Sequence, residues 1–539
     1  MNADQHRYFL GANPLRLLFL SVVVCGNLWL ISSCSSKPTD VRSVIPSDSL
    51  VYLETNDLGK AVRAVTENEA FRNAAKKQPD FSALNGIHIG VAVTGFETKE
   101  QPVTDENSVL NFQPRFVAVA ETNAWNYQAN AFAENKLGEF INEIYGGEVE
   151  LETSPKYDGK YYVWSAQDGR KAYGLVIGSL IFFGNDESAI EKCIAVRKGE
   201  AEPISKNTRL PVGEFLSSGY VSPDGVAQLA NIVGIQFALG AGEEEEVRGF
   251  VARVLPEILR NSVKEITWTA ARSEKGIEDK YIIEPDPESA NVFAETLIPA
   301  ETNVNGLLPY VPPDAVSVTR YDLKNAQVAW RSVLLTAQKK TDAASGSIIG
   351  AFSSSLFEAY GVDDPETFLS SINGGILTVR TDADGENVIV ISTAKDLAKL
   401  KTSIAKEIAF SKPAETVEGA SLWRSEDGDV AFAVIGDKFL VGDAESVVKA
   451  LKANTSGQGF FTNGRVDLPS ASSAISVTVS ESKDPAAKLV QVLSERADKD
   501  PPLDERALIE TRFAGGKLQR TETSNFGLIG SIIEQFAKE

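Results

Sequence analysis

Residues 164–169 read WSAQDG, and residues 423–428 read WRSEDG. In both segments an Asp-Gly pair separates two runs of apolar and aromatic residues. This is the pattern of a β-hairpin, because glycine in the turn takes a positive φ without strain. A further strand follows and ends at Gly184 in one copy and at Gly442 in the other, and acidic and serine residues suited to a helix N-cap come next. The chain is therefore predicted to contain the same strand and helix unit twice.

The similarity extends to both sides of this unit. The sequence IPSD at residues 45–48 and the sequence VPPD at residues 311–314 each precede a predicted strand. Asp-Leu pairs at residues 57–58 and 322–323 then begin a helix. A late hairpin and a closing helix complete each copy. Most of the strands alternate polar and apolar residues, which is typical of antiparallel sheets.

We therefore predict an α+β protein made of two tandem repeated halves, residues 44–300 and 310–539. Each half is expected to be mainly an antiparallel sheet with helices packed on one face. The alignment places Trp164 and Trp423 at the same position, which favours a core layer shared by both halves over a sugar-binding platform.

Several of these structural motifs resemble an uncharacterised family of bacterial envelope proteins, domain of unknown function 3352. The resemblance is carried by the Pro-x-Asp strand, the Asp-Leu helix, the Trp…Asp-Gly hairpin and the strand between Gly178 and Gly184. It covers most of the chain after the N-terminal segment and implies an envelope protein. Because the family has no established activity, the resemblance implies no site residues.

The N-terminus carries the strongest functional signal. An apolar run at residues 17–30 follows Arg7 and Arg16 and ends in the sequence ISSC at residues 31–34. A basic start, a short apolar segment, two small residues and a cysteine are the lipobox pattern of a bacterial lipoprotein signal peptide. The apolar segment would span only ~22 Å as a helix at ~1.5 Å per residue, short of a ~30 Å hydrocarbon core. An uncleaved membrane anchor is therefore the weaker alternative.

We predict that residues 1–33 are a signal peptide and that Cys34 carries a diacylglycerol and a fatty acyl chain such as palmitate, since two or more chains hold a membrane stably. Residues 34–43 would form the lipidated tether. Ser35 follows the cysteine, and no aspartate there indicates retention in the inner membrane. The expected location is the bacterial cell envelope, on the outer membrane and facing the periplasm.

Charge and composition restrict the partners. The formal net charge is −21, and removal of residues 1–33 takes away two arginines and one aspartate, which makes it more negative still. A strongly acidic chain does not suit nucleic acid, whose phosphates require lysine and arginine surfaces. The expected partners are the membrane, through the lipid on Cys34, and an envelope protein.

Reactive groups are few after the signal peptide. His88 is the one histidine there, and the repeat alignment places it against Ile376, which favours a structural role. Cys193 has no partner other than the lipidated Cys34, and its helical setting favours a buried small hydrophobe. We expect no catalytic, cofactor-binding or metal residues, because no motif for them stands in a suitable setting. The one site residue predicted from sequence is Cys34.

These observations favour a non-enzymatic lipoprotein that binds or scaffolds an envelope component. Two alternatives stay open at this point. One is a carrier of a lipid or hydrophobic ligand, held between a curved sheet and its helices. The other is a carboxylate-dependent hydrolase, since the chain has 74 acidic residues among which no pair can be singled out.

The lipid anchor gives the first testable prediction. Cys34→Ala removes the thiol that takes the diacylglycerol, so the protein should move from the membrane fraction to the soluble fraction on cell lysis. Metabolic labelling with a radioactive fatty acid should mark the wild-type protein alone. Cys193→Ala is the control and should leave both readouts unchanged. A membrane fraction that Cys34→Ala leaves intact would refute lipidation.

Overall fold

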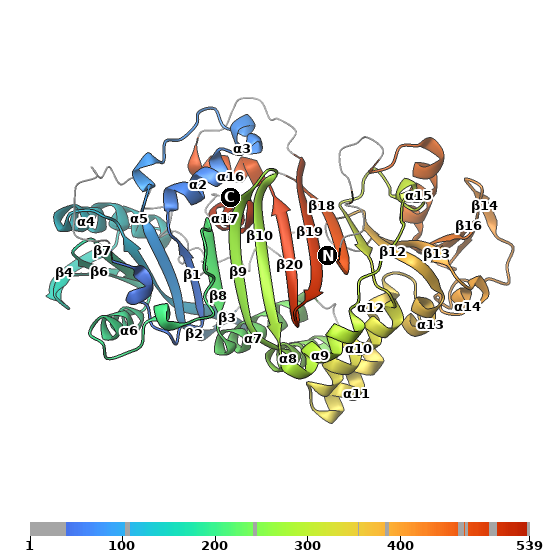
Figure 1. Cartoon of the computed structure of the whole chain (residues 1–539), viewed down its shortest axis with the longest axis horizontal. Helices are drawn as coiled ribbons and strands as arrows, with labels where there is room; N and C mark the ends of the chain where they lie inside the picture. The colour runs from blue at the N-terminus through green and yellow to red at the C-terminus, as the bar shows by residue number, and fades with distance from the viewer. Residues whose placement is uncertain are drawn as a thin grey trace.

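The computed structural model of the chain describes residues 39–102, 108–240, 245–353, 355–382, 387–461, 468, 473–483, 485–494 and 504–535. Within these residues twenty strands form one sheet, and neighbouring strands run antiparallel throughout. Helices pack against the sheet (Figure 1). The predicted α+β class and the antiparallel sheet are confirmed.

The strands fall into two sets of ten along the chain. The first set is β1 (Val51–Thr55), β2 (His88–Pro102), β3 (Ser108–Glu121), β4 (Glu150–Lys156), β5 (Gly159–Ser165), β6 (Lys171–Ile177), β7 (Leu180–Gly184), β8 (Ser217–Val221), β9 (Val263–Ser273) and β10 (Gly276–Pro285). The second set is β11 (Ser317–Tyr321), β12 (Ile372–Arg380), β13 (Val388–Ala394), β14 (Glu415–Val417), β15 (Ala420–Arg424), β16 (Val430–Ile435), β17 (Lys438–Asp443), β18 (Ser476–Lys483), β19 (Asp504–Ala514) and β20 (Lys517–Ser524).

The strand order is the same in both sets. From its outer edge the first set runs β4, β5, β6, β7, β3, β2, β1, β8, β9, β10. The second set runs β14, β15, β16, β17, β13, β12, β11, β18, β19, β20. Adding ten to each label of the first set therefore gives the pairings of the second. Descent of the two halves from one duplicated sequence remains a prediction.

The two sets join where β10 pairs with β20, with Lys280 opposite Thr521. Gly184 of β7 and Gly442 of β17 occupy matching positions in the two halves. If the directly paired residues are followed from these glycines across the strands, β10 is aligned with β20 in such a way that Lys280 and Thr521 are equivalent. An approximate two-fold axis would therefore pass between Lys280 and Thr521. The predicted boundary between residues 300 and 310 falls in the connection to β11, but the sheet crosses from one half to the other without a break.

The helices lie between these strands. In the first half they are α2 (Leu58–Thr66), α3 (Glu69–Ala74), α4 (Asn126–Phe132), α5 (Gly138–Tyr145), α6 (Glu187–Arg197), α7 (Pro223–Gly240), α8 (Glu245–Ser262) and α9 (Pro287–Thr296). In the second half they are α10 (Ala326–Lys339), α11 (Ala343–Phe352), α12 (Ser355–Glu358), α13 (Pro365–Ser370), α14 (Leu397–Lys401), α15 (Ala444–Ser456), α16 (Pro485–Leu493) and α17 (Gly527–Glu534). Short 3-10 turns are η3 (Val41–Ser43), η4 (Ser82–Leu84), η6 (Ile204–Lys206) and η7 (Leu308–Tyr310), and η5 (Ala133–Leu137) is a π-helix.

The halves also share a hydrophobic core. Figure 1 shows α2, α3, α16 and α17 together at one end of the middle strands, and α7 to α11 at the other end. At the first end, Phe71 and Trp268 of the first half pack with Leu489, Phe526 and Ile533 of the second. The two halves are therefore parts of one folded unit.

A buried carboxylate fixes this junction. Asp279 of β10 accepts hydrogen bonds from the Leu528 backbone N–H at 2.7 Å and from Trp268 Nε1 at 2.8 Å. The first bond supplies a partner for a free amide in the first turn of α17. Burial raises the pKa of Asp279 to about 6, although both hydrogen bonds act in the opposite direction. The start of a second-half helix is thus held by a strand of the first half.

Helix coverage differs between the outer and central strands. In the outer part of the first half, the core around Trp164 and Phe183 lies on one side of the sheet, and the core around Tyr161 and Phe182 lies on the other. Helices α4 and α5 belong to the first core and α6 belongs to the second. The prediction of helices on one face is therefore wrong for the outer strands. Large residues point to both faces of β5 and β7, so both faces need cover.

The two tryptophans of the repeat are on the same face but not at the same position. Trp423 pairs with Phe432 of β16, whereas the register from Gly184 makes Gly174 the equivalent of Phe432. Gly174 pairs with Tyr162, so Tyr162 is the equivalent of Trp423. The alignment by sequence, which matched Trp164 with Trp423, therefore differs by two residues from the alignment by hydrogen-bond pairing. That shift keeps the face of the sheet because side chains repeat every second residue.

The shared core predicts that the two halves unfold together. Leu489 of α16 is fully buried against first-half residues, so Leu489→Ala should lower the free energy of unfolding by about 2–5 kcal/mol. Calorimetry with fluorescence from both halves should show one transition in the wild type and in the variant. Leu356→Ala, at a side chain that is 58% exposed, is the control and should change stability little. Two separate transitions in the wild type would contradict the shared core.

Candidate functional site

A row of directly paired residues crosses the centre of the sheet on one face. It runs from Glu54 on β1 through Ser218, Thr269, Lys280, Thr521, Glu510 and Val477 to Arg320 on β11. Side chains that are directly opposite in a sheet point to the same face. The row therefore places eight side chains from eight strands on one surface, with charged residues at both ends and near the middle. We call it the central row.

The middle of this face is open. A cleft of about 610 Å³, which we call the central cleft, lies over β9, β10 and the segment 208–215. Its lining residues are Thr208, Arg209, Pro211, Val212, Phe215, Glu265, Thr267, Thr269, Lys280, Ile282, Glu284 and Lys517. All of them except Glu265 are at least partly exposed. On the other face of the same strands, Trp268, Ala270 and Ile277 are buried under helices.

Ion pairs organise the rim of the central cleft. Arg209 Nη1 lies 2.7 Å from Glu265 Oε1 and 3.7 Å from Glu284 Oε1, and Lys517 Nζ lies 2.7 Å from Glu284 Oε2. Directly opposite Lys280 on the two neighbouring strands are uncharged residues, Thr269 and Thr521. A partner with an acidic or hydroxyl group would therefore meet an ammonium group at the centre of this face.

At the β1 end of the central row, a buried carboxylate holds the N-terminal segment. Glu54 Oε2 accepts hydrogen bonds from Arg42 Nε and from the Tyr52 hydroxyl, both at 2.8 Å. Its other oxygen accepts from Arg42 Nη2 and, at 2.9 Å, from the Ser218 hydroxyl. Both oxygens of the Glu54 carboxylate thus have hydrogen-bond donors. Because two of these bonds come from Arg42, the pair between Arg42 and Glu54 fixes the segment that precedes β1.

These contacts keep Glu54 ionised. Burial by itself would raise the pKa of this carboxyl, but the hydrogen bonds and charge of Arg42, the nearby His88 side chain and the Tyr52 hydroxyl outweigh it. The result is a pKa of about 2, well below the ordinary value of 4.5. For Tyr52 the pKa is raised, first by burial and then by the Glu54 charge. The cluster is therefore charged and stable over the whole range from mildly acidic to alkaline pH.

His88 and Glu121 adjoin the cluster. His88 Nε2 lies 3.7 Å from Glu54 Oε2 and is a buried atom without a hydrogen-bond partner among the described residues. Glu121 is directly opposite His88 on β3 and is 1% exposed. It accepts hydrogen bonds from the backbone N–H groups of Thr39 at 3.1 Å and Asn123 at 3.0 Å. Two buried carboxylates thus stand on either side of the histidine that the sequence singled out.

A second cleft opens over these residues. It has a volume of about 530 Å³, and we call it the anchor-proximal cleft. Its lining residues are Thr39, Asp40, Arg42, Asn56, Gly86, His88, Glu121, Asn123, Pro211, Val212 and Gly213. It shares Pro211 and Val212 with the central cleft. Arg42 also donates to the Pro211 carbonyl at 3.4 Å, so one arginine joins the N-terminal segment, β1 and the segment between the two clefts.

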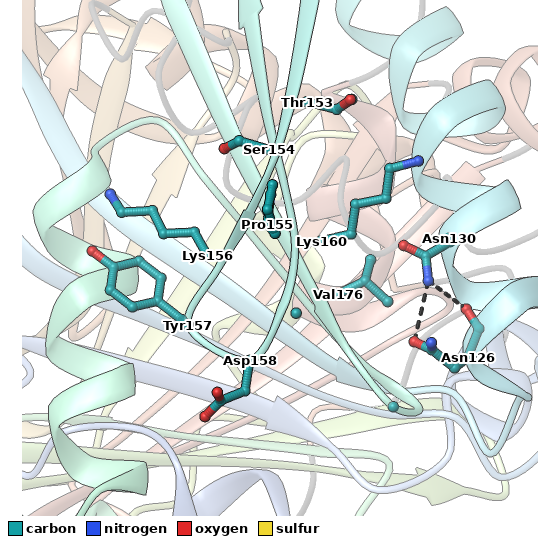
Figure 2. A pocket seen from close by; sticks show the side chains of 12 residues that line it. Asn126, Asn130, Thr153, Ser154, Pro155, Lys156, Tyr157, Asp158, Lys160 and Val176 are labelled. Carbon is teal, nitrogen blue, oxygen red and sulfur yellow. Dashed lines mark hydrogen bonds between the residues drawn. The ribbon is translucent and has the colours of Figure 1, made fainter.

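A third cleft, of about 730 Å³, lies at the outer edge of the sheet around the β4–β5 hairpin, and we call it the hairpin cleft. Figure 2 shows Lys156 and Tyr157 on one side of this hairpin and Lys160, Asn126 and Asn130 on the other. Thr153, Ser154 and Asp158 also line it. It is separate from the two clefts of the central face, with which it shares no lining residue.

The sequence-predicted residues are placed as follows. Cys34 lies outside the described residues. Cys193 is buried in α6 and forms no disulfide among the described residues, and burial raises the pKa of its thiol. By the pairing of β1 and β11, His88 corresponds to Gly375, one residue from the predicted Ile376, at a register irregularity of β12. Within the described part of the chain, no group of three or more His, Cys, Asp or Glu side chains could hold a metal ion.

Sequence reasoning missed Arg42, Glu54 and Glu121. Their partners come from distant parts of the chain, so local patterns did not single them out. A signal existed for Glu54, which follows Tyr52 at a spacing of two residues on a short strand and therefore points to the same covered face. An acidic residue at such a position requires a buried partner.

Comparisons with known proteins add little. No family model matches the chain, and no curated protein matches it. One solved structure, described as crystal form IV of TP0453, is similar over 49% of this chain and 86% of that chain, with 9% sequence identity and a TM-score of 0.23. A likeness at that level supports no conclusion about fold or function. Over the described residues, no helix is both long and apolar enough to cross a bilayer.

The Glu54 cluster predicts a pH-dependent contribution to stability. A carboxyl whose pKa is lowered on folding stabilises the protein above its unfolded pKa, and this contribution is lost as pH falls toward the folded value. Glu54→Gln should lower the free energy of unfolding by about 3 kcal/mol at pH 7, because it leaves the Arg42 charge without its partner. The difference between wild type and variant, measured by urea unfolding, should shrink between pH 5 and pH 3.

The matched control is Glu139→Gln, at an exposed carboxylate on α5 whose side chain is 66% exposed. Its effect should stay within ~0.5 kcal/mol at every pH. If the effect of Glu54→Gln on the free energy of unfolding does not change with pH, the neighbours of Glu54 do not lower the pKa of its carboxyl.

Proposed function

We propose that this chain is a lipid-anchored protein of the bacterial envelope that binds another envelope protein on its central face and catalyses no reaction. The lipid on Cys34 would attach it to the outer membrane, with the body in the periplasm. The proposal rests on the chemistry of the N-terminal sequence and on the surface that the sheet presents. No cofactor or metal is required for such a role.

The open central cleft is the observation that carries the proposal. On the opposite face of the same strands, residues such as Trp268 pack against helices. On the face of the central cleft, threonines and paired charges remain accessible over several strands. A polar, partly exposed surface with one central ammonium group offers hydrogen bonds and charge pairs to a partner without exposing an apolar patch. The outer strands of the two halves stand on either side of the middle strands β9, β10, β20 and β19 (Figure 1).

The path of the tether supports a role at the membrane surface. Thr39 is held to the body by Glu121, and it is the fifth residue after Cys34. A fully extended chain reaches at most ~3.6 Å per residue, so Cys34 lies within ~18 Å of Thr39. Since Thr39 lines the anchor-proximal cleft, this side of the body would lie close to the bilayer. A partner on the central face would then also be near the membrane.

The carrier alternative has one observation in its favour. An apolar cavity lies between the sheet and helices α2 and α17, lined by residues that include Leu58, Trp268 and Ile529. Its volume of about 60 Å³ is far below the roughly 300–1,000 Å³ of typical ligand sites. A lipid would require the two helices to move apart, so we favour the docking role over the carrier.

The hydrolase alternative is favoured by the two buried carboxylates beside His88. Both carboxylates, however, are already engaged. Glu54 is bound by Arg42, Tyr52 and Ser218, and each oxygen of Glu121 accepts a backbone N–H. A general acid or base needs a proton site that can reach the substrate. These groups are better suited to holding the chain than to proton transfer.

Site-specific photocrosslinking tests the docking role. A photoreactive amino acid at Thr269 or Thr521, on the central row, should crosslink the full-length lipoprotein to one dominant envelope protein in intact cells. The same group at Arg197, at the end of α6, is the control position and should give no such product. Equal crosslinking from all three positions, or none from the central row, would count against the proposal.

Charge reversal at the centre of the row sharpens the test. Lys280→Glu should weaken the crosslink to that partner by tenfold or more, which corresponds to ~1.4 kcal/mol of binding energy. Lys275→Glu, in the turn between β9 and β10, changes the net charge equally but lies outside the central cleft. It should leave the crosslink unchanged. The melting temperature of both variants should stay close to that of the wild type, which separates lost binding from unfolding.

A further inference from the structure

We propose that the hairpin cleft is a second binding site and that its ligand is an uncharged saccharide. The inference does not depend on the docking role of the central face, because the two sites share no residues. It rests on the side chains that the hairpin cleft exposes, on the conformation of its turn and on the neutralisation of its two lysines.

The cleft is rich in hydrogen-bonding groups that the protein does not use. Thr153, Ser154 and Asp158 are exposed, and no hydrogen bond or ion pair of their side chains is present among the described residues. Asn130 donates to the Asn126 backbone oxygen at 2.7 Å and to Asn126 Oδ1 at 3.1 Å, which leaves the Asn126 amide NH₂ available (Figure 2). Hydroxyl, amide and carboxylate groups of this kind match the donors and acceptors of sugar hydroxyls.

The turn that presents Asp158 is strained. Tyr157 and Asp158 connect β4 to β5 and have φ values of 56° and 60°, in the left-handed region that glycine or asparagine normally occupies. The Tyr157 hydroxyl donates to Glu191 at 2.7 Å, and Lys156 Nζ lies 4.7 Å from the centre of its ring. The ring is thus held from two sides. A strained backbone that surrounding contacts hold in place is typical of functional sites, which indicates a functional role for Tyr157 and Asp158.

Charge identifies the class of ligand. Lys156 Nζ lies 2.6 Å from Glu187 Oε1, and Lys160 is paired with Glu134. Since each lysine is neutralised by its own glutamate, Asp158 is the one lining residue whose charge is not paired within the described structure. A phosphate or carboxylate ligand would be repelled. The site therefore suits a neutral ligand that is rich in hydroxyl groups.

The edge of the sheet disfavours an extended peptide as the ligand. Lys156 and Gly159 flank the two-residue turn and pair with each other, so the backbone of Pro155 faces outward from the hairpin. Proline has no N–H to give to an added strand. Sugars instead stack their apolar ring faces on aromatic side chains, and Tyr157 is the aromatic residue that lines this cleft.

Isothermal titration of the full-length lipoprotein in a non-glycosidic detergent tests the inference. The probes are chitotetraose and cellotetraose, two soluble neutral oligosaccharides, and inorganic phosphate as the anionic comparison. At least one oligosaccharide should bind saturably, and phosphate should not. Asp158→Gly should weaken that binding at least tenfold while leaving the melting temperature equal to or above that of the wild type, because glycine relieves the turn.

Glu150→Gln is the matched control, since it removes a carboxylate from β4, the strand that leads into this turn, at a position outside the cleft, and it should leave binding unchanged. Absence of saturable binding by both oligosaccharides would overturn the inference, as would phosphate binding or oligosaccharide binding that Asp158→Gly leaves intact. Crosslinking from Thr269 in the Asp158→Gly variant should match the wild type. Failure of the saccharide site is thereby distinguished from failure of the docking role.

Discussion

The pairing of β10 with β20 is the interaction on which the rest of the structure depends. Without it the chain would form two separate sheets, each with an unpaired edge at its centre. Exposed edges of this kind are prone to pair with other chains. Pairing the two edges with each other removes both and places Lys280 opposite Thr521. It also creates the continuous central face, since neither half alone has enough strands to form it.

The buried charges of the central face show how two similar halves can differ in chemistry. By register Glu54 on β1 is the equivalent of Arg320 on β11. Glu54 is paired with Arg42, whereas Arg320 Nε lies 2.6 Å from Asp322 Oδ2 on its own strand segment. Each half therefore buries one ion pair at the same place with the charges reversed. In the first half that pair holds the N-terminal segment at residues 39–42 against β1.

The same segment relates the clefts to the membrane. Arg42 contacts both Glu54 and the Pro211 carbonyl, so residues 39–42, β1 and the segment between the central and anchor-proximal clefts are joined through one side chain. A lipid attached a few residues before Thr39 would restrict the body to orientations in which these clefts remain near the bilayer. The hairpin cleft belongs to the outer edge of the sheet, where β4 has a strand on one side only among the described residues. Its position allows a second ligand to bind at the same time.

The sequence by itself determined the class of the fold, the order of the strands and helices within the repeated unit, and the chemistry expected at Cys34. Alternation of polar and apolar residues, Asp-Gly turns and helix caps are local signals, so they were readable without a structure. The tertiary structure alone decided how the halves join, because strand partners far apart in sequence leave no local pattern. It also decided the register that pairs Tyr162, not Trp164, with the position of Trp423. The cluster of Arg42, Glu54 and Glu121 was hidden for the same reason: buried charges find their partners through space, across strands that the sequence does not show to be neighbours.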